Sequence, residues 1–131
     1  MDNKEFREMK LSELFEKFSE KDGAIEVISL STSDGFAIQT YIKNEHQFEV
    51  DTMAAAASTL YSVSKAVAQQ ILSKEFKSTF IEANQGNVCF VAFSLNDKDF
   101  VLAMSADQTM NIASLRLCVN RLAEEIKNIF I

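Results

Sequence analysis

The sequence predicts an α+β fold in which a five-stranded antiparallel sheet packs against three helices. Three observations support this prediction. Apolar residues recur at helical spacing in three stretches, and they alternate along five others. Short turn-rich segments join consecutive strands, which is typical of antiparallel neighbours. No linker rich in Pro, Gly or Ser interrupts the 131 residues, so we expect one domain over 1–131, with the helices on one face of the sheet.

The first elements are a helix over 4–20 and two strands over 24–31 and 36–43. The helix has an apolar stripe with i, i+3, i+4, i+7 spacing, formed by Leu11, Leu14, Phe15 and Phe18. Gly23 is a candidate for its C-terminal cap. Asp34-Gly35 predicts a hairpin turn between the strands. Alternation in the second strand predicts one face with Phe36, Ile38, Thr40 and Ile42, and the other with Ala37, Gln39 and Tyr41.

The middle helix, about 51–74, has too little charge for an ordinary surface helix. Asp51 is placed to cap its first turn. From Thr52 through Ser73 the only charged residue is Lys65. A helix with one face on a sheet normally carries charge on the other. Small residues, Ala54 to Ser58, allow a second backbone to approach closely. We therefore expect this helix to be covered on two sides, which indicates self-association.

Three strands and a helix complete the chain. The strands are predicted over 76–83, 87–94 and 99–105, and the turn-rich segments between them indicate a meander. The last helix, about 110–130, has a single apolar stripe, formed by Ile112, Leu115, Val119, Leu122, Ile126 and Ile129.

Composition and charge exclude several functions. A formal net charge of −6 argues against a nucleic-acid or anionic-membrane partner. We see neither a secretory signal nor an apolar stretch long enough to span a membrane, so we expect a cytoplasmic protein. The sequence has no glycine-rich phosphate-binding loop, so we do not expect the chain to be a GTPase or ATPase itself.

Candidate catalytic residues have simpler interpretations. His46, the only histidine, is expected to be an exposed loop residue rather than a base or metal ligand. Cys89 and Cys118 lie in apolar segments and are interpreted as core thiols. A triad of Ser31 or Ser33 with Asp34 and His46 has only sequence proximity in its favour. We therefore predict no enzymatic activity, no cofactor and no metal.

Charged residues on two helices can be interpreted either as partner contacts or as solvated surface charges. Arg116 and Arg121 on the last helix are either donors to a partner or solvated charges. The acidic residues of the first helix either attract a basic partner or form a solvated face; they are Glu5, Glu8, Glu13 and Glu16.

The ordered series of segments resembles the Roadblock family, which is named for a dynein light chain. The matching stretches are Gly23-Ala24-Ile25-Glu26-Val27, Ser33-Asp34-Gly35-Phe36, Asp51-Thr52-Met53-Ala54-Ala55-Ala56, Val101-Leu102-Ala103-Met104-Ser105 and Asn111-Ile112-Ala113-Ser114-Leu115-Arg116-Leu117. The family often has Gly where this chain has Ala113 or Ser114, which leaves the subfamily open. The resemblance implies a topology like that of profilin- and longin-like proteins.

The resemblance also implies a dimer and a partner. Middle helices of family members pack antiparallel, and their third strands pair edge to edge. For this chain that implies an interface containing Met53, Ala56, Tyr61, Val63, Phe76 and Phe80. The family includes MglB-like regulators of bacterial gliding and scaffolds of lysosomal Rag-GTPase signalling. We therefore expect a homodimeric regulator or adaptor of a small Ras-like GTPase, stimulating hydrolysis, if at all, without an arginine finger. The alternatives are a scaffold without a GTPase and a PAS-like small-molecule sensor.

Overall fold

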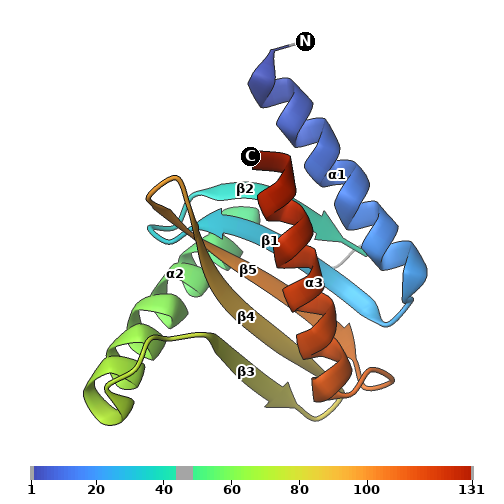
Figure 1. Ribbon diagram of the computed structural model, residues 1–131. Helices are drawn as coiled ribbons and strands as arrows, with labels where there is room; N and C mark the ends of the chain where they lie inside the picture. The colour runs from blue at the N-terminus through green and yellow to red at the C-terminus, as the bar shows by residue number, and fades with distance from the viewer. Residues whose placement is uncertain (1, 44–48, 131) are drawn as a thin grey trace.

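The computed structural model describes residues 2–43 and 49–130 (Figure 1). Helices and strands follow one another in the predicted order. They are α1 (Asn3–Lys21), β1 (Ile25–Thr32), β2 (Ala37–Ile42), α2 (Val50–Val67) with its π-helical continuation η1 (Ala68–Leu72), β3 (Ser78–Ala83), β4 (Gly86–Leu95), β5 (Lys98–Asp107) and α3 (Ile112–Phe130). The α+β prediction is confirmed.

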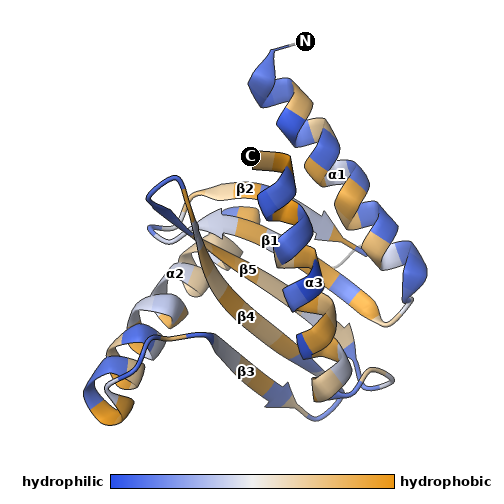
Figure 2. Ribbon diagram, viewed as in Figure 1, coloured by the Kyte–Doolittle hydropathy of each residue, from blue (hydrophilic) through white to orange (hydrophobic). Residues whose placement is uncertain are grey.

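The five strands form one antiparallel sheet in the order β2-β1-β5-β4-β3. β2 and β3 are therefore its two edges. Helices α1 and α3 cover one face, whereas α2 crosses the other (Figure 1). The expectation that all helices share one face is wrong. β4 and β5 are apolar on both faces (Figure 2), so each face requires a cover.

The larger core fills the space between the sheet and the pair α1 and α3. The predicted stripe of α1 supplies Leu11, Phe15 and Phe18. The stripe of α3 packs on the same face of the sheet and contributes to the same core. Each fully buried side chain of this kind contributes about 1.5–3 kcal/mol. The core is filled by side chains of Leu, Ile, Phe, Val and Met, including the fully buried Ile28, Leu30, Leu102, Met104, Leu122 and Ile126.

The contact of α2 with the sheet is made by small residues. Ala54 and Ala57 are fully buried, and Ala57 packs on Phe90, Val101 and Ala103. The Ser58 hydroxyl donates to the carbonyl oxygen of Ser33 at 2.7 Å, which joins α2 to the β1–β2 turn. Short side chains thus bring the helix backbone near the protein's own sheet, so Ala54 and Ala57 are not free for a second copy.

One residue of β2 interrupts the predicted alternation. Leu30 pairs with Gln39 and Ser31 pairs with Ala37, which leaves Ile38 as the extra residue of a β-bulge. Ile38 therefore packs into the same core as Tyr41, and not on the face of Thr40 as alternation predicts. The bulge shifts the side-chain phase of the residues that precede it.

Both predicted helix caps are corrected. Helix α2 begins at Val50 after the N-cap Glu49, and Asp51 lies inside its first turn, where a carboxylate still favours the helix dipole. Helix α1 ends at Lys21. Its C-cap Asp22 has an extended backbone, and the Asp22 carboxylate accepts the Ala24 N–H at 3.0 Å. This local hydrogen bond turns the chain, so a left-handed glycine at position 23 is not required.

Candidate protein interaction surface

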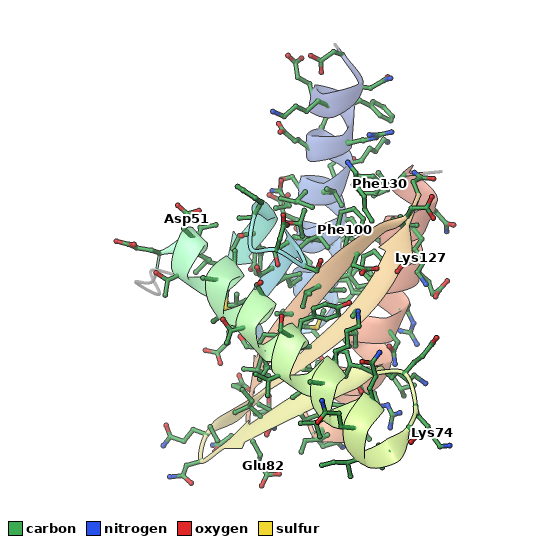
Figure 3. All side chains as sticks on the ribbon, turned by 90° about the vertical axis from the view of Figure 1, so that its left-hand side faces the viewer. Asp51, Lys74, Glu82, Phe100, Lys127 and Phe130 are labelled. Atoms are coloured by element: carbon green, nitrogen blue, oxygen red, sulfur yellow. The ribbon has the colours of Figure 1, made fainter. Side chains whose placement is uncertain are left out.

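The side of α2 that points away from the sheet carries no charge. Its residues, here called the outer face of α2, are all exposed: Thr52, Ala55, Ala56, Thr59, Ser62, Val63, Ala66, Val67 and Gln70. In Figure 3 this helix runs across the front of the molecule from Asp51 toward Lys74. An exposed face with small and apolar residues over several turns is typical of a surface that another protein covers.

The most apolar part of this surface lies where α2 meets the edge strand β3. Thr79 of β3 donates a hydrogen bond to the Ser64 hydroxyl at 2.7 Å, which fixes that side of the helix over β3. Val67 and Ile71 follow Ser64 on the same side of the helix. The apolar flank consists of Val63 and Val67 of α2, with 56% and 48% exposure, Ile71 of η1, with 75%, and Ile81 of β3, with 46%.

The two edges of the sheet differ in how well they can accept another strand. β3 pairs with β4 over six consecutive residues without a bulge, and its only charged residue is Glu82. β2 carries the bulge at Ile38 and is packed against α1. Bulges and covering helices are common devices that prevent pairing at an edge. β3 is therefore the edge with the regular backbone that strand pairing requires.

The six residues predicted for a dimer interface fall into four places. Ala56 and Val63 lie on the outer face of α2. Met53 and Tyr61 point toward the protein's own sheet and pack on the cluster that contains Phe90. Phe76 lies in the connection before β3, where its ring contacts Tyr61 edge to face. Phe80 of β3 packs on the larger core. The interface itself stays a prediction.

Sequence reasoning missed three exposed residues of the apolar flank. Val67, Ile71 and Ile81 are as exposed as Val63 or nearly so. The signal was present for two of them, because Val63, Val67 and Ile71 recur at i, i+4 and i+8 along the helix. Ile81 carried no such signal, since only the pairing with Val88 shows which face of the sheet it occupies.

Cys89 and Cys118 both pack in the larger core, as their apolar segments predict. Burial raises the pKa of the Cys89 thiol to about 11, against a smaller lowering by Arg116. Burial, followed by Asp22, raises the pKa of Cys118, and Arg121 opposes this. Both thiols are therefore protonated and weakly nucleophilic at neutral pH. Over residues 2–43 and 49–130 no cluster of His, Cys, Asp and Glu is suited to hold a metal ion.

The described residues add no geometric support for a triad of Ser31 or Ser33 with Asp34 and His46, which has only sequence proximity in its favour. The Asp34 carboxylate accepts a hydrogen bond from Thr32 within the β1–β2 turn, as a turn residue does. Ser31 is fully buried in β1. His46 lies outside the described residues.

Among the helices that the structure describes, none combines the length and the hydropathy needed to cross a membrane.

The remaining charged candidates are at the surface. Arg116 and Arg121 are exposed on α3, and Glu5, Glu8, Glu13 and Glu16 are exposed on α1. Both helices lie on the face of the sheet opposite to α2. The charged residues and the uncharged outer face of α2 thus occupy opposite sides of the molecule.

Comparison with known proteins identifies the family. The family model for the Roadblock/LC7 domain matches residues 10–106. The fold is similar to that of MglB in a tetrameric arrangement (TM-score 0.80, 17% identity, covering 94% of this chain and 89% of that one). It is also similar to Myxococcus xanthus MglB (0.78, 18%, 93% and 88%) and to the gliding protein MglB of Thermus thermophilus (0.79, 17%, 94% and 90%). No curated protein matches the chain by sequence. The chain belongs to the Roadblock/LC7 family.

Proposed function

We propose that this chain is a non-catalytic, homodimeric regulator or adaptor of a small Ras-like GTPase in the cytoplasm. The observation that carries the proposal is the uncharged outer face of α2 together with the apolar flank beside β3. Four exposed branched aliphatic side chains on two adjacent elements are unfavourable in water. A second copy would cover them, and family membership supports this geometry.

In the proposed dimer the α2 helices of two copies pack antiparallel, and their β3 strands pair into one continuous sheet. The exposed alanines on the outer face of α2 would allow two helix backbones to approach closely. The unbulged β3 would contribute its free N–H and C=O groups to the new ladder. A specific dimer of this kind buries about 1,200–2,000 Å² in total.

The GTPase would bind the α2 side of this dimer. The sequence contains three arginines, Arg7, Arg116 and Arg121, and all lie on α1 or α3, across the sheet from α2. No arginine of this chain would then reach the nucleotide from the α2 side. Any stimulation of hydrolysis would then have to act on the GTPase's own catalytic groups, without an arginine finger from this chain.

Binding to nucleotide-loaded GTPase tests the proposal. Small Ras-like GTPases from the same organism would be loaded with GDP, with a GTP analogue, or with GDP and aluminium fluoride, and passed over the immobilised protein. We expect binding in one nucleotide state and its loss in Val63→Glu. Leu117→Glu, an equal change of charge on the exposed side of α3, should bind normally.

A hydrolysis assay separates a regulator from an adaptor. A regulator accelerates GTP hydrolysis, and an Arg116→Ala, Arg121→Ala double variant retains the acceleration. An adaptor binds without changing the rate. Absence of binding in every nucleotide state would reject the GTPase partner and leave the alternative of a scaffold that binds other proteins.

A further inference from the structure

A polar groove lies beside α2 on the side away from the apolar flank. It is bounded by the second half of α2, by the connection that precedes β3, and by the ends of β4 and β5, and its volume is about 470 Å³. Tyr61 and Lys65 line it from the helix, Glu75 and Phe76 from the connection, and Asp99 from β5. Figure 3 shows α2 and this connection, near Lys74, in front of the sheet.

The carboxylate of Asp99 is held in place by groups from separate elements. The Tyr61 hydroxyl of α2 donates to Oδ2 at 3.3 Å, and the Ser94 hydroxyl of β4 donates to Oδ1. The Asp99 backbone carbonyl accepts the Ser33 N–H at 2.9 Å. A residue tied to α2, β4 and the β1–β2 turn has little freedom to reorient. It is a preorganised acceptor.

The Asp99 carboxylate can accept more hydrogen bonds than the protein donates to it. A carboxylate accepts about four hydrogen bonds, and protein hydroxyls provide two. Among the described residues no Lys or Arg forms an ion pair with Asp99. Glu75, which is exposed, adds a second negative charge to the wall of the groove. Donors from outside the chain can therefore bind Asp99 from the groove.

The walls of the groove favour a cation with a flat shape. The rings of Tyr61 and Phe76 meet edge to face, with centroids 6.0 Å apart and planes at 70°. The Lys65 ammonium lies 5.6 Å from the centre of the Tyr61 ring, so this ring already attracts a positive charge. A guanidinium can stack on an aromatic ring and donate two parallel hydrogen bonds to a carboxylate, which an ammonium cannot do.

We propose that this groove binds the arginine side chain of a protein partner, with the guanidinium donating to Asp99 and packing against Tyr61 and Phe76. The proposal requires neither the dimer nor a GTPase. Lys65 shares the groove, and its positive charge opposes an incoming guanidinium. The site therefore predicts opposite effects for two substitutions: loss of the Asp99 charge weakens binding, and loss of the Lys65 charge strengthens it.

The experiment is an NMR titration of the full chain with Nα-acetyl-arginine amide. The citrulline analogue has the same shape without the charge and serves as the reference ligand. We expect saturable shifts of the amide signals of Ser94, Asp99 and Gln69 with the arginine compound, and shifts at least several-fold smaller with the citrulline compound. In Asp99→Asn the shifts should be lost. Asp97→Asn, an equal change at the exposed tip of the same hairpin, should behave as wild type.

Lys65→Gln keeps the test decisive if Asp99→Asn disturbs the fold. This variant should bind the arginine compound several-fold more tightly, and a damaged fold would not produce tighter binding. Equal shifts with the arginine and citrulline compounds would overturn the proposal. So would wild-type binding by Asp99→Asn, or weaker binding by Lys65→Gln.

Discussion

Val63→Glu is the sharpest perturbation of the proposed dimer. Val63 lies on the outer face of α2 and forms part of the apolar flank, and 56% of its surface is exposed in one copy. The substitution should leave the monomer intact, because Val63 belongs to neither core cluster and Glu has a higher helix propensity than Val. Its effect should therefore appear in the association of two copies.

The magnitude follows from the exposed fraction. Complete burial of a valine side chain contributes about 1.5–3 kcal/mol, and slightly more than half of Val63 remains to be buried. That gives about 1 kcal/mol per copy, or about 2 kcal/mol for a symmetric pair. Two carboxylates placed in an apolar contact add at least about 2 kcal/mol more. The sum, about 4 kcal/mol, raises the dimer Kd roughly a thousandfold.

Sedimentation velocity over a range of concentrations measures this Kd. Leu117→Glu on α3 is the matched control, since Leu117 is 64% exposed and lies on the opposite face of the sheet. It should leave the Kd unchanged. If Val63→Glu dimerises like the wild type, or if both variants dissociate equally, α2 is not the interface.

Three further predictions concern the fold. Gly86→Ala should lower the free energy of unfolding by about 1–3 kcal/mol, because the new Cβ would lie 2.6 Å from the Ala106 carbonyl oxygen. Gly23→Ala is the control: its Cβ meets nothing closer than 4.0 Å, so it should change the free energy of unfolding by less than about 0.5 kcal/mol. Equal effects of the two substitutions in urea unfolding would contradict the reasoning. Wild type should lose stability relative to Cys89→Ala between pH 9 and about 11, because the thiol of the unfolded chain ionises near its ordinary pKa of 9.0 while burial raises the folded pKa to about 11. A constant difference in stability across this range would show that folding does not raise the pKa of this thiol. Asp97→Gly should raise the thermal midpoint slightly, since Asp97 has φ 66° in the β4–β5 turn, where glycine carries no steric cost, and a lower midpoint would oppose this account.

Local periodicity was sufficient to predict the elements but not the side of the sheet that each helix covers. All helix and strand ends lie within two residues of the prediction when η1 is counted with α2. The apolar residues of β4 occupy both faces, with Phe90 on the α2 side and Cys89 and Val91 on the other. Consecutive apolar residues in one strand are visible in the sequence, and they indicate a strand that is covered by helices on both faces. Placing every helix on one face would leave Phe90 and its neighbours in water.

The bulge and the groove could not be predicted from local patterns. One extra residue in β2 leaves the apolar pattern almost unchanged, because both phases of the strand contain apolar side chains, among them Ile38 and Tyr41. The groove joins Tyr61 to Asp99 across 38 residues, and only the packing of α2 on the sheet brings them together. In the sequence, Asp99 is one more polar residue after a turn.

The central claim is that this chain associates with itself through α2 and β3. Sedimentation equilibrium of the wild-type protein at micromolar concentration tests it most directly, since the chain has a mass of 14.7 kDa. We predict a species with twice that mass, which Val63→Glu converts to the monomer. A wild-type protein that remains at 14.7 kDa throughout this range would contradict the account.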